Sequence, residues 1–299
     1  MEQKTNVIPS FVRAGEYNWL RRFIKSNKKL HSLFYRLLRC NRFIFILQNR
    51  RCNTDSLFKS VEIETTSICN RKCPFCPVAY DNSQKVIMSD EIFDKIITEL
   101  KELNFKGEIA FAGYGEPLLD KRLEEFVKRI KKELGFSVEI VTNGDFLTYE
   151  RFKQLISAGA DTFRLSQHDK EPSEQIKEFF SNVQKNELKY IIFQTAAEGS
   201  ITFTNRGGSL KIKTLHPFYC STMHLIIRAD GSVPLCCNDY YKEISFGNIK
   251  EERLIDIWNK PFYRKIRNEI KRGIFNLEIC EKCLGLIPSG ERINPKKIR

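Results

Sequence analysis

Residues 61–77 read Val-Glu-Ile-Glu-Thr-Thr-Ser-Ile-Cys-Asn-Arg-Lys-Cys-Pro-Phe-Cys-Pro. The apolar residues at the start of this stretch predict a β-strand over 61–66. Cys69, Cys73 and Cys76 follow at once, so one short loop carries three thiols. Three protein thiolates leave a bound metal centre with one open position, as in catalytic metal sites. On spacing alone, a structural zinc site completed by a distant fourth ligand is an alternative.

The chain beyond this loop alternates short apolar runs with amphipathic stretches of helical period. We expect further strands at 108–112, 137–141, 162–165, 190–193 and 210–213, with helices at 89–103, 121–134, 148–158 and 172–186. Six strands with intervening helices predict an α/β fold with a parallel sheet, closed or partly closed. The polar segments 113–117, 142–144 and 166–169 follow strands two, three and four, where such folds carry their functional residues.

The pattern changes near residue 217. Residues 225–228 and 232–235, separated by Ala229-Asp230-Gly231, predict a β-hairpin. Short helices are expected at 254–258 and 262–270. This part of the chain therefore has no parallel-strand pattern and is expected to form a second, smaller module.

Composition limits the class of protein. The chain has 299 residues, of which 41% are hydrophobic, so it can bury a sizeable core. No run approaches the ~20 apolar residues of a membrane span, and the first residues lack the layout of a secretion signal. We therefore expect a cytoplasmic protein with reduced thiols, in which clustered cysteines are metal ligands or catalytic thiols rather than disulfides.

The net charge of +13 is concentrated in residues 1–60, which hold thirteen Lys and Arg against three acids. Apolar residues recur among these charges at near-helical spacing. Helices packed on the barrel with a solvated basic face explain this pattern. A sharper interpretation is peripheral membrane contact through residues 16–48, as an interfacial helix on anionic lipid. Nucleic-acid binding is not expected, because no groove-reading motif accompanies the charge.

The cysteine loop resembles the signature loop of the radical S-adenosylmethionine superfamily, including the aromatic Phe75 before the third cysteine. The resemblance implies a partial (β/α)6 TIM-like barrel over residues 61–215. It also implies that Cys69, Cys73 and Cys76 bind a 4Fe–4S cluster, whose open iron is chelated by S-adenosylmethionine, and that Phe75 lies against the adenine. In that family one electron from the cluster cleaves S-adenosylmethionine and yields a 5′-deoxyadenosyl radical.

Two further motifs support the resemblance. Gly113-Tyr114-Gly115-Glu116-Pro117 is similar to the family's glycine–glutamate motif, in which Gly113 and Gly115 permit close backbone approach and the Glu116 carboxylate, next to Pro117, meets the methionyl ammonium. Ser166 matches the position that commonly binds the ribose, although it is equally a serine of a turn before a helix. The family's adenine-side pattern is not found on the fifth strand, where Gln194 and Thr195 are weak candidates.

A second set of cysteines follows the barrel segment. Cys220, Cys236, Cys280 and Cys283, in order with Gly247-Asn248-Ile249 and Trp258, resemble the SPASM module in its shortened "twitch" form. The resemblance implies that these four cysteines bind an auxiliary 4Fe–4S cluster in a module over residues 216–290, followed by a polar tail, 291–299. Four protein ligands suit electron transfer rather than substrate binding. A four-cysteine structural zinc site is the alternative.

Three residues near these motifs are candidate catalytic groups. Cys237 adjoins an expected ligand and is an inert buried thiol, a replacement ligand or a hydrogen-atom donor to a substrate radical. Asp239 is a candidate proton acceptor, although acids in loops are mostly solvated. His168, beside Asp169 after the fourth strand, is a candidate base for the proton of a radical alcohol or amine.

The leading prediction is a radical S-adenosylmethionine oxidoreductase that dehydrogenates a sugar-, polyol- or aminocyclitol-like substrate and passes the electron to the auxiliary cluster. A redox-neutral epimerase or peptide-modifying enzyme that uses Cys237 is the enzymatic alternative. A zinc-stabilised protein that binds nucleic acid or membrane is the non-enzymatic one. The leading prediction implies a small-molecule or lipid-linked substrate and a one-electron reductant of the flavodoxin or ferredoxin type. Location is expected to be cytoplasmic, with membrane association if the basic segment is interfacial.

Overall fold

The structure is a computed structural model that describes residues 57–169, 171–195, 204–210, 220 and 223–285. The predicted interfacial helix at 16–48 and the polar tail at 291–299 lie outside the described residues. Of the strand predicted at 210–213, only Leu210 is described, and it lies outside any strand. The division of the sequence into 1–60, 61–215, 216–290 and 291–299 stays a prediction.

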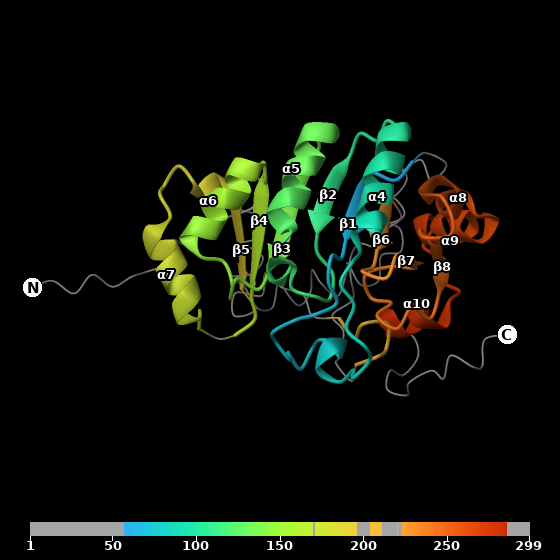
Figure 1. The fold of residues 1–299 in the computed structure, drawn as a ribbon. Helices are drawn as coiled ribbons and strands as arrows, with labels where there is room; N and C mark the ends of the chain where they lie inside the picture. Colours follow the sequence, from blue (N-terminus) through green and yellow to red (C-terminus); the bar gives the residue numbers. More distant parts are fainter. Residues whose placement is uncertain (1–56, 170, 196–203, 211–219, 221–222, 286–299) are drawn as a thin grey trace, which may run out of the picture.

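A six-stranded parallel sheet forms the centre of the fold (Figure 1). Its strands are β1 (Ser60–Ile63), β2 (Glu108–Phe111), β3 (Ser137–Thr142), β4 (Thr162–Gln167), β5 (Ile191–Thr195) and β6 (His224–Ile227). They lie in the order β5-β4-β3-β2-β1-β6, and every neighbouring pair is parallel. The carboxyl ends of all six strands therefore meet at one edge, and the predicted α/β fold is confirmed.

Four helices connect β1 to β5: α4 (Asp90–Glu102), α5 (Leu123–Glu133), α6 (Tyr149–Ala158) and α7 (Glu174–Asn182). Ser89, Thr148 and Ser173 cap α4, α6 and α7 by accepting a backbone N–H of the first turn. Such caps contribute about 0.5–2 kcal/mol each. α7 is shorter than the predicted helix 172–186, because Val183 takes an extended conformation directly after Asn182.

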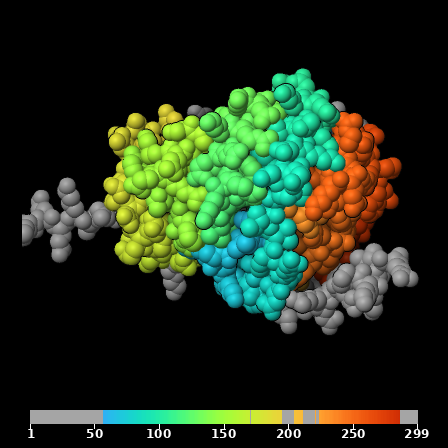
Figure 2. Space-filling view, viewed as in Figure 1, coloured from blue at the N-terminus to red at the C-terminus, as the bar shows by residue number. Residues whose placement is uncertain are grey.

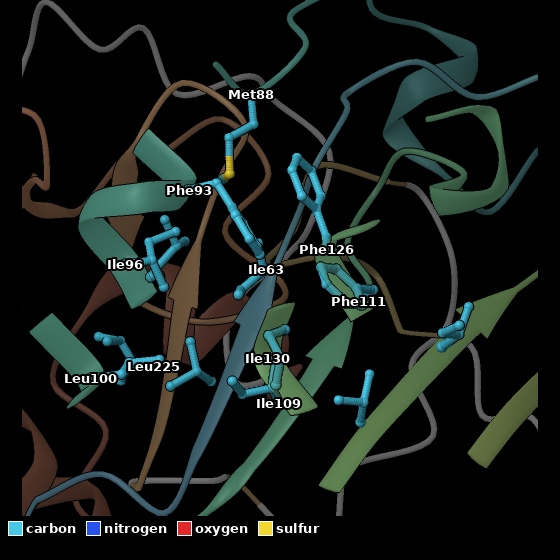
Figure 3. Close-up of a cluster of buried hydrophobic side chains, with 14 of the residues drawn as sticks. Ile63, Met88, Phe93, Ile96, Leu100, Ile109, Phe111, Phe126, Ile130 and Leu225 are labelled. Carbon is cyan, nitrogen blue, oxygen red and sulfur yellow. The ribbon is translucent and has the colours of Figure 1, made fainter. Parts of the chain in front are cut away.

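The core lies between one face of the sheet and the helices (Figure 3). Phe93 of α4 stacks on Phe126 of α5 with 3.9 Å between ring centroids. Ile63 of β1 is fully buried in this core. Because side chains alternate along a strand, Glu62 lies on the opposite face of the sheet from Ile63. That opposite face therefore carries charged residues.

A smaller group of elements follows β6: β7 (Ser232–Pro234), β8 (Ser245–Asn248), α8 (Leu254–Asn259), α9 (Pro261–Lys271) and α10 (Glu278–Cys283). Trp258 of α8 meets the Phe58 ring edge-on at 5.3 Å, and the guanidinium carbon of Arg267 lies 3.7 Å from the Trp258 ring centroid. Phe58 and Trp258 belong to the same hydrophobic core as the sheet. Figure 2 shows the orange C-terminal elements packed directly against the teal residues around α4.

The predicted hairpin of residues 225–228 and 232–235 is wrong. β6 pairs in parallel with β1, and β7 pairs in antiparallel with β8. The chain does turn here, since the Arg228 amide donates to the Ser232 carbonyl across 2.9 Å. The continuous apolar run Leu225-Ile226-Ile227 is typical of a buried parallel strand rather than of a half-exposed hairpin strand. Among the described residues, the sixth strand of the sheet is therefore 224–227, whereas residues 211–213 of the strand predicted at 210–213 lie outside them.

Candidate active site

The three-cysteine loop leaves the carboxyl end of β1. Cys69, Cys73 and Cys76 are free, half-buried thiols. Burial, followed by the charges of Cys76 and Cys69, raises the pKa of Cys73 to about 11, although Arg71 opposes this. Burial raises the pKa of Cys69 as well, and Cys76 adds to the shift. Since each thiol affects the pKa of another, the three are neighbours, as ligands of one cluster must be.

Arg71, inside this loop, fastens it to the loops after β3 and β4. Its Nε donates to Asp145 across 2.6 Å, and its Nη1 lies 3.0 Å from an Asp169 oxygen. Asn70 donates to Asp145 across 2.7 Å and accepts from the Asn143 amide across 3.0 Å. This clamp joins residues distant in sequence, was not predicted, and links the cysteine loop to the ends of two neighbouring strands.

The glycine–glutamate loop follows β2 and lies against residues 64–68. A Cβ at Gly115 would stand 1.7 Å from the Thr66 carbonyl oxygen, and one at Gly113 would stand 2.5 Å from the Glu64 carboxylate. The Glu116 amide donates to the Ile68 carbonyl across 2.8 Å. The two glycines therefore permit close approach to the base of the cysteine loop, so the two motifs form one structural unit.

Glu116 is buried, with only 2% of its surface exposed. Its carboxylate accepts hydrogen bonds from the Thr142 hydroxyl (2.6 Å) and from the amides of Asn143 (2.9 Å) and Leu118 (3.1 Å). A carboxylate has about four acceptor sites, so one remains. Burial raises its pKa, and no Lys or Arg within the described ranges forms an ion pair with it. A buried carboxylate without a cation is suited to a ligand ammonium.

Two candidate residues come from the carboxyl end of β4, namely Ser166 and His168. A third, Phe75, comes from the cysteine loop and contacts His168. Ser166 is inside β4, opposite Gln194 of β5, so it is not a turn serine. The Phe75 and His168 rings contact each other with 4.7 Å between centroids. Burial, and then the charges of Arg71 and Arg206, lower the pKa of His168 to about 4. The imidazole is therefore neutral near neutral pH and can accept a proton.

The second cysteine group gathers from three places. Cys220 precedes β6, Cys236 follows β7, and Cys280 and Cys283 lie on α10; all are free and half-buried. Burial, and then the charges of Cys280, Cys237 and Cys283, raise the pKa of Cys220. Burial and Cys283 raise the pKa of Cys280 to about 12. Burial, and then the charges of Cys237 and Cys220, raise the pKa of Cys236. Thiols from three separate segments of the chain are thus brought within electrostatic reach of one another.

The donor sets fit iron–sulfur clusters better than a single ion. Among the residues that the structure describes, no three His, Cys, Asp or Glu side chains gather closely enough to hold one metal ion. A cubane cluster places four irons and four sulfides between its thiolates, so its ligands stand farther apart than those of one zinc ion. Three converging thiols at the first group and four at the second match the ligand numbers of an open and a closed cubane.

Cys237 and Asp239 differ from each other in exposure. The Cys237 side chain is exposed, and desolvation by the surrounding protein raises the pKa of its thiol. The inert buried interpretation therefore does not fit. Asp239 is buried, and its two oxygens accept the amides of Glu243 (2.8 Å) and Ile244 (3.1 Å). Both oxygens hold a backbone turn, so a catalytic role for Asp239 has no support in this geometry.

A charged cluster that the sequence analysis missed lies between the two cysteine groups. The Tyr114 hydroxyl donates to the Cys237 carbonyl across 2.6 Å, and the Arg228 guanidinium lies 4.6 Å from its ring centroid. Arg228 forms a buried ion pair with Glu64 at 2.9 Å. Charged residues directly after the strands 60–63 and 224–227 could have indicated this cluster, had those strands been recognised as neighbours.

This cluster borders a cavity of about 270 Å³. Glu64, Tyr114 and Arg228 line it from the strand ends, residues 81–86 line it from the cysteine-loop side, and 240–242 line it from the segment after Cys236. Tyr240 donates to Asp81 across 2.6 Å and so joins two of these walls. Charged and phenolic side chains project into the cavity wall, and segments adjacent to both cysteine groups form this wall.

Two family models match the chain. The model of the radical SAM superfamily matches residues 63–193. The model of the SPASM iron–sulfur cluster-binding domain matches residues 219–284. The chain belongs to the radical SAM superfamily, in the subclass that carries a SPASM domain. Both resemblances drawn from the cysteine spacing are thereby confirmed.

Known proteins are similar to this radical SAM chain over most of its length. It is 29% identical over 239 residues to an S-adenosyl-L-methionine-dependent 2-deoxy-scyllo-inosamine dehydrogenase of Niallia circulans, over 77% of this chain and 94% of the relative. The crystal structure of BtrN in complex with AdoMet and 2-DOIA superposes with a TM-score of 0.70 and 26% identity, over 81% of this chain and 98% of BtrN. An open conformation of BtrN gives 0.59 and 25%, over 79% and 96%.

These matches establish an iron–sulfur oxidoreductase whose cofactors are S-adenosylmethionine and 4Fe–4S clusters, with the auxiliary cluster in the SPASM domain. The predicted cofactors and enzyme class are confirmed, and the alternative of a zinc-stabilised binding protein is wrong. Within the described ranges, no helix has the length and apolar content needed to cross a bilayer.

Proposed function

We propose that this radical SAM enzyme dehydrogenates an aminocyclitol or a related sugar-like alcohol. The observation that carries the proposal is a cavity lined by charged and phenolic side chains, whose walls adjoin both cysteine groups. Its carboxylates, phenols and cations suit a substrate rich in hydroxyl and amino groups. The name of the Niallia circulans relative, a dehydrogenase of 2-deoxy-scyllo-inosamine, supports the same substrate class.

The cysteines take the roles that the sequence analysis predicts. Cys69, Cys73 and Cys76 hold the cluster that binds S-adenosylmethionine, and Cys220, Cys236, Cys280 and Cys283 hold the auxiliary cluster. Glu116 meets the methionyl ammonium with its remaining acceptor site, and Gly113, Gly115 and Pro117 shape that loop. Phe75 and Ser166 contact the adenosine part. When bound, these groups supply a one-electron cleavage that makes a hydrogen-abstracting adenosyl radical, and an acceptor for one electron.

The chain's own residues position the substrate and manage its proton. Dehydrogenation of an alcohol removes one hydrogen atom from carbon, one proton from oxygen and one further electron. The buried Glu64–Arg228 pair fixes the cavity wall, and Tyr240 and Asp81 present polar atoms to a hydroxylated ring. His168, neutral because burial lowers its pKa to about 4, is placed as the proton acceptor. When the further electron leaves, the hydroxyl becomes that of a protonated carbonyl, which is acidic enough to give its proton even to so weak a base.

Two partners complete the proposal. The S-adenosylmethionine cluster needs a one-electron reductant of the flavodoxin or ferredoxin type. The basic, apolar sequence over residues 16–48 supports peripheral contact of a cytoplasmic enzyme with anionic membranes, where a lipid-linked substrate would be within reach.

The test uses the full chain with both clusters, purified without oxygen and supplied with a strong reductant and a panel of aminocyclitols, polyols and sugars. A substrate should give a product two hydrogens lighter and an equal amount of 5′-deoxyadenosine. Tyr240→Phe should raise KM while leaving substrate-free deoxyadenosine formation unchanged, and Tyr190→Phe, outside the cavity wall, should change neither. Products of unchanged mass across the panel would reject dehydrogenation. The exposed thiol of Cys237 favours an epimerase as the second candidate.

A further inference from the structure

Residues 204–210 lie directly on the helix that carries two auxiliary-cluster cysteines. The Asn205 side chain donates to the Lys282 carbonyl of α10 across 2.7 Å. A Cβ at Gly207 would stand 2.5 Å from the Ile279 side chain, and one at Gly208 would stand 2.7 Å from that of Lys282. Both glycines have positive φ, at 65° and 89°. This close packing fixes the loop relative to Cys283.

Arg206 in this loop has a left-handed backbone conformation, with φ of 50°. Such a conformation is uncommon for a residue other than glycine and points to a structural or functional constraint. The Arg206 guanidinium carbon lies 5.3 Å from the ring centroid of Tyr114, whose hydroxyl donates to the Cys237 carbonyl. The guanidinium therefore lies between the glycine–glutamate loop and the segment that follows Cys236.

Asn238 connects Arg206 to a cluster cysteine. Its Nδ2 donates to the Cys283 sulfur across 3.3 Å. Its Oδ1 accepts from the Thr204 hydroxyl at 2.8 Å and from Arg206 Nη1 at 3.5 Å. A guanidinium can only donate, so it selects the amide orientation in which oxygen faces Arg206 and nitrogen faces sulfur. The direction of the hydrogen bond to Cys283 is thus set by Arg206.

We propose that Asn238, oriented by Arg206 and Thr204, is a positioning residue that raises the reduction potential of the auxiliary cluster. A hydrogen bond to a ligating sulfur stabilises the reduced, more negative cluster, and a nearby cation acts in the same direction. A higher potential makes the cluster a better acceptor for an electron from the substrate. The inference rests on the proposed function, in which Cys283 is a ligand and the auxiliary cluster accepts that electron.

The test measures the midpoint potential of the auxiliary cluster by an EPR-monitored redox titration. The variant lacking Cys69, Cys73 and Cys76 serves as background, so that the auxiliary cluster alone gives the signal. Asn238→Leu removes the donor at similar volume. Asn238→Asp also removes it but keeps an acceptor for Arg206 and Thr204 and adds a negative charge. Both changes should lower the midpoint potential, the aspartate more, while iron content stays constant.

Asn182→Asp is the matched control. Asn182 is exposed on α7, at the opposite end of the molecule from α10 (Figure 1), and this change should leave the potential where it is. An unchanged potential in Asn238→Asp would overturn the proposal. Loss of iron from Asn238→Asp would overturn it too, because that variant retains the contacts to Arg206 and Thr204 and would show Asn238 to be structural. The titration contains no substrate. The expected shift in midpoint potential would therefore still be observed if the proposed dehydrogenation proved wrong.

Discussion

The Tyr114 hydroxyl donates a 2.6 Å hydrogen bond to the carbonyl oxygen of Cys237. Tyr114 belongs to the glycine–glutamate loop after β2. Cys237 follows β7 and is the residue after Cys236, one of the four cysteines assigned to the auxiliary cluster. The two loops are far apart in sequence, and this bond ties the S-adenosylmethionine side of the site to the auxiliary-cluster side. A displacement of either loop therefore acts on the other.

Tyr114→Phe should uncouple radical formation from product formation. The change leaves the Cys237 carbonyl without its donor, at a cost of about 1–3 kcal/mol if the group stays buried. We expect a lower melting temperature, retained iron, and more 5′-deoxyadenosine released per product. Tyr149→Phe is the control, because the Tyr149 hydroxyl bonds to Glu187, away from the site. Equal coupling in both variants would show that the bond has no catalytic importance.

Cofactor content tests the two cysteine groups. Anaerobic reconstitution should yield about eight iron and eight sulfide per chain, since each cubane holds four of each. Replacing Cys69, Cys73 and Cys76 together by alanine should leave about four of each, and so should replacing the other four cysteines. Elemental analysis and sulfide assays give the numbers. Near-stoichiometric zinc with little iron would contradict the assignment.

Substitutions of Glu116 should distinguish its role in S-adenosylmethionine binding from its role in protein stability. Glu116→Gln keeps the shape and one acceptor oxygen but loses the charge that faces an ammonium. A charge-assisted hydrogen bond of about 1.5–3 kcal/mol predicts roughly 10- to 100-fold weaker S-adenosylmethionine binding. Glu116→Ala should also lower the melting temperature, because three donors lose their acceptor. Isothermal titration and thermal unfolding are the measurements.

Glu99→Gln is the control for Glu116. Glu99 is another buried carboxylate, which accepts from the Leu254 amide. Its loss should lower stability without affecting S-adenosylmethionine affinity. If Glu116→Gln binds S-adenosylmethionine as well as the wild type does, the carboxylate is purely structural.

Heavy water distinguishes dehydrogenation from hydrogen return through Cys237. A dehydrogenase leaves no solvent deuterium on the reacting carbon, and Cys237→Ala keeps most of its rate. An epimerase must return a hydrogen atom to carbon, so its product gains one deuterium and the alanine variant stalls after radical formation. We expect the first outcome, because an auxiliary cluster provides an electron acceptor. Mass spectrometry of the product decides; one carbon-bound deuterium would favour the epimerase.

Vesicle sedimentation tests the basic segment. Full-length protein should sediment with anionic vesicles at low salt, and a variant lacking residues 1–50 should not, because lysines and arginines near an anionic surface each contribute about 1 kcal/mol. Both variants should keep their iron. Neutral vesicles are the control. Absence of binding by the full chain would favour the alternative that the basic helices pack on the barrel.

Local sequence signals predicted much of the fold and the site. The helices predicted from residues 89 and 148 begin at Ser89 and Thr148, because these hydroxyls cap helices through contacts within a few residues. The spacing of Cys69, Cys73 and Cys76 lies within one loop and could be read in the same way. The pairing of β6 with β1 could not, because its partners are separated by most of the chain. Tyr114, Arg206 and Asn238 were missed for the same reason, since each acts through a residue distant in sequence.

The place of β6 in the sheet bears on how such enzymes exchange their parts during evolution. β6 lies within the range matched by the SPASM model, yet it completes the sheet of the radical SAM half. A recombination event that replaced everything after residue 193 would therefore pair β1 with an edge strand from another protein. A chimaera of two relatives should keep the native pairing of β1 only if its crossover falls after β6, so the unit that can be exchanged without changing the sheet begins later than the SPASM match does.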